Sequence, residues 1–203
     1  VADVTIAADG SASYQFFIDG TATFAYEKKN LPDITNGDVD AIYFGTLATI
    51  VEPGATVLFE WMKGAVGKVP IIFDPNIRPT VMGDRERYQS AVARFLQISD
   101  VVKASTDDIG WLYPDMHEFE VAKSWLEHGV KLVVITRGEN GLVGITGEHM
   151  VEVPGVKVDV VDTVGAGDTV GAVIAEAVKV IGLSELHGAV LMTVLEKAAH
   201  AAA

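Results

Sequence analysis

The chain has 203 residues, 49% of them hydrophobic, so it can bury one sizeable core and fits a single domain with a small appendage. Its 15 basic and 28 acidic residues give a net charge of −13, which repels nucleic acid and anionic membrane surfaces. The lack of cysteine excludes disulfides and is compatible with the cytoplasm, and no apolar run is long enough for a membrane span.

The first 30 residues are predicted to form a small β segment. Residues 4–8 and 13–18 read as the two strands of a hairpin, and residues 21–25 as a further extended segment. Aromatic residues are bunched in the second strand, and Phe17 is one of them, so each face of the ribbon should carry a ring. Such a ribbon either packs on the core as an edge hairpin or needs a partner.

Strand and helix patterns alternate from residue 31 to residue 203, which predicts an α/β domain. Strands are expected at 41–44, 69–73, 101–104 and 131–136, and helices at 53–66, 85–98, 107–113 and 119–127. A hairpin of 141–146 and 149–153 follows, with helices from 168 to about 180 and from 185 onward. This alternation predicts a parallel sheet covered by helices on both faces, with ligands at the carboxyl ends of the strands.

The strongest chemical signal lies where an apolar run ends at Asp162. A turn of small residues, Gly165, Ala166 and Gly167, precedes a helix that opens at Asp168. The first turn of a helix has unpaired N–H groups and a positive dipole end, and can hold a phosphoryl group. A carboxylate there would repel phosphate, so its best use is to accept a proton from an attacking hydroxyl. The simpler alternative is an N-cap beside a tight turn.

A second polar group follows the strand at 69–73 and reads Asp-Pro-Asn-Ile-Arg-Pro. Asn76 and Arg78 supply directional donors for sugar hydroxyls or phosphate oxygens, on a loop that the prolines stiffen. The alternative is a rigid turn held by an internal pair between Asp74 and Arg78.

A third group follows the strand at 101–104. In the structural interpretation, Ser105 is the N-cap of a helix and Asp108 an acidic residue of its first turn. Lys103 is a solvated surface lysine in that interpretation. A carboxylate at this place can also act on Mg²⁺ through water.

A fourth group is the turn after the strand at 131–136. The hydroxyl of Thr136 and the N–H groups of Gly138 and Gly141 can bind phosphate or ribose oxygens, although such residues also occur in turns for local reasons. Arg137 either reaches a phosphate or is exposed.

These groups, in this order, resemble the ribokinase-like sugar kinases, the phosphofructokinase B (PfkB) family, over nearly the whole chain. Residues 162–168 resemble the family signature, whose last Asp is the catalytic base, and residues 74–78 resemble a segment of fructokinases and sugar-acid kinases. Residues 42–49 resemble a stretch of fructokinases, which favours fructose over a 2-keto-3-deoxy sugar acid as the substrate. The resemblance implies a three-layer α/β sandwich with a mostly parallel central sheet and a small β lid, here residues 1–30.

The resemblance also implies roles for individual residues. The base is Asp168, with Gly165, Ala166 and Gly167 stabilising the transferred phosphoryl. ATP is bound by Lys103, Ser105, Thr136, Gly138, Gly141 and Gly167. The sugar is bound by Asn76, Arg78 and Phe17. Asp108 acts on Mg²⁺ through water, and Asp162 and the carbonyl of Val164 bind a monovalent cation such as K⁺.

The expected function is therefore that of a cytoplasmic, ATP-dependent kinase that converts a small sugar, most simply fructose, to its 6-phosphate. The acceptors 2-keto-3-deoxygluconate, ribose and a nucleoside stay open, as does a non-catalytic nucleotide-binding protein. The expected partners are the sugar, ATP and a second copy bound through the β lid. Family chains carry a substrate-binding strand ahead of the segment that matches Val1, so we expect this sequence to be a piece with weak or no turnover by itself.

Overall fold

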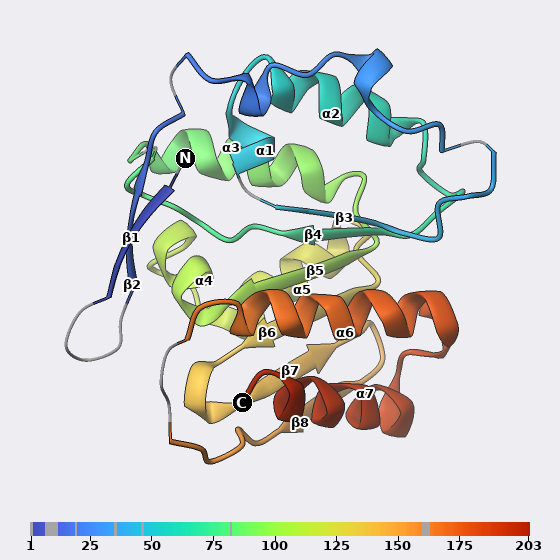
Figure 1. Ribbon diagram of the computed structural model, residues 1–203. Coiled ribbons are helices and arrows are strands. Elements are labelled where there is room, and N and C mark those ends of the chain that lie inside the picture. The colour runs from blue at the N-terminus through green and yellow to red at the C-terminus, as the bar shows by residue number, and fades with distance from the viewer. Residues whose placement is uncertain are drawn as a thin grey trace.

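The computed structural model describes residues 2–6, 12–18, 20–34, 36–45, 47–81, 83–159 and 163–203. A two-stranded antiparallel ribbon is formed by β1 (Ala2–Ile6) and β2 (Ala12–Phe16), and it does not pair with the main sheet. The ribbon stands at the side of the molecule at which the long helix α6 (Ala166–Val180) begins (Figure 1). The predicted hairpin is thus present as a separate small sheet.

The main sheet has six strands whose spatial order equals their order along the chain. They are β3 (Ile42–Gly45), β4 (Ile71–Asp74), β5 (Val101–Ser105), β6 (Leu132–Thr136), β7 (Leu142–Ile145) and β8 (Met150–Val153). The first four are parallel, and the last two form an antiparallel hairpin beside β6. The prediction of a mostly parallel central sheet is confirmed.

In the part of the chain that the structure describes, five helices connect the parallel strands. They are α1 (Leu47–Ile50), α2 (Gly54–Lys63), α3 (Arg85–Leu96), α4 (Thr106–Leu112) and α5 (Glu118–Glu127). The chain ends with α6 and α7 (Gly188–Ala201), which lie in front of the sheet in Figure 1. None of the helices within the described ranges combines the length and hydropathy that crossing a bilayer requires.

Short 3₁₀ turns account for the places where the sequence prediction was wrong. Residues 21–25, expected to be extended, contain the 3₁₀ turn η1 (Ala22–Phe24), which the N–H of Ala25 closes by donating to the carbonyl of Ala22. The last helix begins three residues later than expected, because η4 (Leu183–Glu185) takes up the start of that segment. Local hydrogen bonds of this kind leave no hydrophobic period in the sequence. The remaining turns are η2 (Lys28–Asn30) and η3 (Gly138–Asn140).

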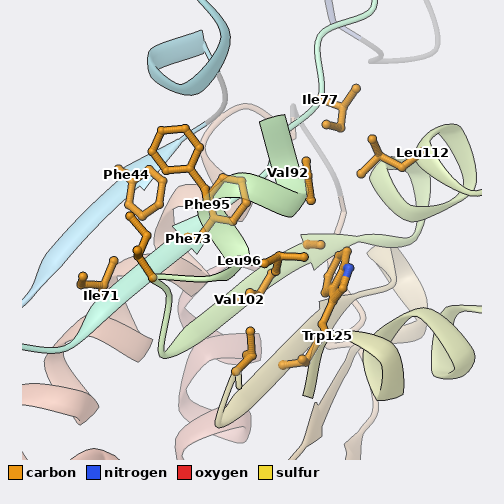
Figure 2. Close-up of a cluster of buried hydrophobic side chains, with 14 of the residues drawn as sticks. Phe44, Ile71, Phe73, Ile77, Val92, Phe95, Leu96, Val102, Leu112 and Trp125 are labelled. Atoms are coloured by element: carbon orange, nitrogen blue, oxygen red, sulfur yellow. The ribbon is translucent and has the colours of Figure 1, made fainter. Parts of the chain in front are cut away.

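Alternate residues of the strands feed two separate cores, one on each face of the sheet. Ile71 and Phe73 of β4 pack with α2, α3 and α5, whereas Ile72 between them packs with α6 and α7. Figure 2 shows the first core, in which Phe44 and Phe73 stack with ring centroids 4.9 Å apart and Phe95 lies against both. Both faces of the sheet are thus covered, as expected for three layers.

Two valines on α6 offer a test of the second core. Val178 is 3% exposed and Val180 is 73% exposed, on the same helix. We expect Val178→Ala to lower the free energy of unfolding by about 1–3 kcal/mol more than Val180→Ala does, because only the first change empties packed space. Urea denaturation measures the difference, and equal effects would contradict the packing of α6 on the sheet.

Candidate functional site

Two cavities open where the parallel strands end and α6 begins. The larger, of about 890 Å³, is lined by the turn after β6, the loop after β8, the start of α6 and the last residues of α7. The smaller, of about 400 Å³, is lined by the loop after β4, the side chain of Lys103 in β5, the last residue of β2 and the start of α6. Thr163 and Gly167 line both cavities, so the first turn of α6 separates them.

The start of α6 has the geometry of an anion site with a carboxylate beside it. Gly165 adopts the left-handed conformation (φ 83°) that lets the chain turn into the helix, and the hydroxyl of Thr169 donates to its carbonyl at 2.9 Å. Asp168 is exposed, lines the smaller cavity and has no hydrogen bond or ion pair to another described residue. It is therefore not the N-cap of this helix, a position that Gly165 takes.

The smaller cavity gathers residues from three parts of the sequence. Asn76 and Arg78 come from the loop after β4, Lys103 from β5, and Asp168 from α6. The backbone of Arg78 is held by Tyr88, whose hydroxyl donates to its carbonyl at 3.0 Å and accepts from its N–H at 3.2 Å.

The last residue of β2, at the open end of the ribbon, also reaches this cavity. Phe16, and not Phe17, lines it, because neighbouring residues of an extended chain point to opposite sides. Phe17 is 47% exposed. Val164 lines the cavity and is 52% exposed, whereas Asp162 lies outside the described residues.

The larger cavity is lined by Thr136, Gly138 and Gly141, together with Ala199 and Ala202 near the end of α7. The sequence interpretation anticipated the first three but not the loop after β8 that faces them.

That loop interlocks with the turn after β6. A Cβ atom at Gly141 would lie 2.6 Å from the nitrogen of Gly155, and one at Gly155 would lie 2.8 Å from the carbonyl carbon of Glu139. Gly141 also has a φ of 91°, which strains any other residue. Only glycine fits at these two places. The two glycines were thus the feature of the sequence that could have indicated the contact between these loops.

Ser105 and Asp108 form the capping box of α4 and line neither cavity. The Ser105 hydroxyl donates to Asp108 Oδ2 at 2.7 Å and accepts from the Asp108 N–H at 3.0 Å. The other carboxylate oxygen, Oδ1, accepts from the N–H of Ile77 at 2.6 Å, which anchors the loop after β4. These bonds occupy the buried carboxylate, so it fits a structural role better than a role in holding Mg²⁺. The described residues contain no cluster of three or more acidic, histidine or cysteine side chains suited to a metal ion.

Arg137 neither faces a cavity nor stands free in solvent. Its guanidinium pairs with Glu118 of α5 and with Glu152 of β8, the latter at 3.2 Å, and lies 5.0 Å from the ring centre of Phe119. It joins the strand hairpin to a helix and so supports the turn that it belongs to. Both roles predicted for it, phosphate contact and simple exposure, were wrong.

A buried polar group that the sequence reading missed lies beneath the start of α6. Asp74 Oδ2 accepts hydrogen bonds from Tyr43 Oη and Lys103 Nζ, both at 2.7 Å. Burial raises the pKa of the Asp74 carboxyl, and the charge of Lys103 acts against that rise. Burial and the Asp74 charge also raise the pKa of Tyr43. Asp74 therefore pairs with Lys103 and not with Arg78, and Lys103, 5% exposed, is no surface lysine.

Known proteins resemble this chain in sequence and in structure. Residues 4–203 match the family model for the pfkB family of carbohydrate kinases. A fructokinase of Rhizobium leguminosarum bv. trifolii is 39% identical over 176 residues, which are 86% of this chain and 53% of that protein. The chain thus spans about half the length of the curated relatives it matches.

Two solved structures share the fold over nearly the whole chain. A double mutant of the Vibrio cholerae O395 fructokinase, bound to fructose, ADP and a potassium ion, has a TM-score of 0.85 at 22% identity and covers 100% of this chain and 65% of its own. The aminoimidazole riboside kinase of Salmonella enterica, complexed with aminoimidazole riboside and an ATP analog, has a TM-score of 0.76 at 22% identity. The match covers 94% of this chain and 63% of the kinase.

The interlocked loops of the larger cavity can be tested with a pair of glycines. We expect Gly155→Ala to lower the free energy of unfolding by about 1–3 kcal/mol, because the new methyl group presses on the Glu139 backbone. Gly147→Ala, in the turn between β7 and β8, meets no atom within 4 Å and should change it by less than about 0.5 kcal/mol. Urea denaturation compares them, and an unchanged Gly155→Ala variant would contradict the close approach.

Proposed function

Because this chain belongs to the pfkB family of carbohydrate kinases, we propose that it forms the nucleotide-binding part, and a wall of the acceptor site, of an ATP-dependent sugar kinase. The reaction would transfer the γ-phosphoryl group of ATP to a primary hydroxyl of a small sugar. One observation carries this proposal: the glycine turn of α6 lies between two cavities, with Asp168 in the smaller one.

The larger cavity is the proposed site for ATP. Its volume of about 890 Å³ suits a nucleotide, and it lies against Thr136 and the backbone of Gly138 and Gly141. Phosphates that extend from it reach the first turn of α6, where Gly167 lines the cavity. Lys103 reaches the same turn from strand β5 of the sheet. Ser105 would act indirectly, by holding the start of α4.

The smaller cavity is the proposed site for the acceptor. Asn76 and Arg78 offer hydrogen-bond donors to sugar hydroxyls, and Asp168 stands where an acceptor hydroxyl would meet the phosphoryl group. Its carboxylate would take the hydroxyl proton as the oxygen forms a bond to the γ-phosphorus and the bond to the ADP oxygen breaks. N–H groups of Gly165, Ala166 and Gly167 would stabilise the charge on the transferred group. The ribbon would cover the sugar through Phe16, which lines this cavity in place of Phe17.

Mg²⁺ bound with ATP would offset the charge of the phosphates. Asp108 would be its carboxylate, acting through water, but Oδ2 of Asp108 is engaged in the α4 capping box and Oδ1 accepts from the N–H of Ile77. The proposed K⁺ site needs Asp162, which lies outside the described residues, and the carbonyl of Val164. Both ion sites stay predictions.

Fructose is the proposed acceptor because a fructokinase is 39% identical over most of the chain. The similarity to an aminoimidazole riboside kinase favours a nucleoside-like sugar as the second candidate. A 2-keto-3-deoxy sugar acid and ribose are further candidate acceptors. A coupled assay of ADP release across these acceptors separates them. We also propose a dimer through the ribbon and a cytoplasmic location.

Replacing the proposed base tests catalysis directly. We expect Asp168→Asn to lower kcat by about 10²–10⁴-fold while ATP affinity stays within a few-fold, because the proton acceptor is lost and the glycine turn is kept. Glu176→Gln, on the same helix and paired with Lys197 on the surface, is the matched control and should keep full activity. Steady-state kinetics and calorimetry measure the two quantities. Unchanged turnover in Asp168→Asn would exclude the proposed base, and ATP binding without turnover in any form would favour a non-catalytic nucleotide-binding protein.

The length of the chain gives a separate prediction. Since it spans about half of the matched fructokinase, we expect weaker fructose phosphorylation by the chain alone than by an N-terminally extended form. ADP release at saturating ATP compares the two forms at equal concentration. Equal activity would contradict the expectation that further acceptor-binding groups are required.

A further inference from the structure

Three neighbouring parallel strands each direct one polar side chain at the same point beneath α6. Tyr43, Asp74 and Lys103 belong to β3, β4 and β5 and lie on the face of the sheet that α6 covers, since their neighbours Phe44, Phe73 and Val102 join the opposite core. The Tyr43 hydroxyl and the Lys103 ammonium both donate to Asp74 Oδ2 at 2.7 Å. We refer to these three residues as the sub-helix triad.

The sub-helix triad is costly for the fold. Asp74 is 2% exposed and Lys103 is 5% exposed, and a buried ion pair of this kind often stabilises no more than apolar residues of the same volume would. The other carboxylate oxygen, Asp74 Oδ1, is buried without a hydrogen-bond partner among the described residues. An unsatisfied buried oxygen calls for an explanation other than stability.

Two glycines bring α6 into contact with the triad. Gly167 and Gly171 are four residues apart and so lie on one face of the helix. A Cβ atom at Gly167 would lie 3.1 Å from Lys103 Nζ, and one at Gly171 would lie 2.7 Å from the Tyr43 ring carbon that bears the hydroxyl. A side chain at either position would displace the Lys103 ammonium or the Tyr43 ring. The ammonium is thereby held directly under the first turn of α6.

The Lys103 ammonium also has donor capacity to spare. It has three N–H donors, and Asp74 is its one partner among the described residues. Lys103 lines the smaller cavity together with Asp168. Two donors are thus left for oxygens of a ligand at the point where the helix dipole also favours an anion.

We propose that Tyr43 and Asp74 are positioning residues that hold the Lys103 ammonium in place and direct it at a phosphate oxygen held by the first turn of α6. This inference rests on the proposed function and adds residues that act through Lys103. Asp74 is the buried counter-ion of that ammonium, at 2.7 Å. Tyr43 fixes the orientation of that carboxylate through its hydroxyl, and its ring is seated against Gly171.

Other charged groups near the triad do not replace Asp74. Asp168 and Asp108 raise the local negative charge from α6 and α4, and their fields act on Tyr43 and Asp74 respectively. Arg78, from the loop after β4, shares the smaller cavity. Among the described residues, none of these three forms an ion pair with Lys103, so Asp74 alone fixes the ammonium there.

The test compares binding of Mg²⁺-ATP with binding of adenosine, because only ATP carries the phosphates that Lys103 would meet. We expect Lys103→Met and Asp74→Asn to weaken ATP binding by roughly tenfold to hundredfold with adenosine binding unchanged, the loss expected for a hydrogen bond to a charged group. Tyr43→Phe should weaken ATP binding by about threefold to tenfold, since the ring stays and only the fixing hydroxyl is lost. Isothermal titration calorimetry on the whole chain gives both affinities.

The choice of ligand separates positioning from simple structural support. A residue with a purely structural role would weaken the binding of ATP and of adenosine alike, whereas a loss confined to ATP indicates a contact with phosphate.

Lys131→Met is the matched control, because Lys131 pairs with Asp100 at 2.8 Å near the other end of the same strands, away from both cavities. It should leave ATP and adenosine affinities unchanged. Tyr43→Phe keeps the packing on Gly171 and carries the test if the two charge variants do not fold.

Several outcomes overturn the inference. They are equal weakening of ATP and adenosine binding in the triad variants, an unchanged ATP affinity in Lys103→Met, or no ATP binding by the unmodified chain. A selective loss of ATP affinity in a chain that phosphorylates no acceptor would support the triad while contradicting the proposed function, so the two failures are distinguishable.

Discussion

The close seating of α6 on the ends of the parallel strands is the constraint on which the rest of this structure depends. Gly167 and Gly171 leave the helix without side chains where it crosses Lys103 and Tyr43. The helix start is therefore fixed above a buried cation rather than above an apolar layer. Apolar residues of α6 also complete the second core. The packing that stabilises the fold therefore also sets the position of the first turn of α6.

The two cavities follow from that seating. The first turn of α6 forms a wall common to both, and the remaining walls come from loops at the carboxyl ends of different strands. Each of these loops is held by its own local device: the Tyr88 hydroxyl at Arg78, the capping box of α4, and the glycine contacts between Gly141 and Gly155. Rigid local anchoring keeps groups from distant parts of the sequence at a common edge.

Charge is distributed so that an anion meets attraction only at short range. The net charge of −13 gives no long-range steering toward phosphates. Arg137 pairs with Glu118 and Glu152, whereas Lys103, paired with Asp74, and Arg78 line the smaller cavity. The helix start and these two side chains bring N–H donors to one place in an otherwise acidic molecule.

The sequence by itself determined the alternation of strands and helices and the motifs at the strand ends, including the glycine turn before Asp168, because these depend on local period and local backbone needs. A parallel sheet then brings its carboxyl ends to one edge, so the gathering of Asn76, Arg78 and Asp168 was predictable. Only the tertiary structure decided that Asp74 binds Tyr43 and Lys103 and that Phe16 reaches the cavity. Those choices depend on strand register and helix seating, which join residues far apart in the chain and leave no periodic trace in it.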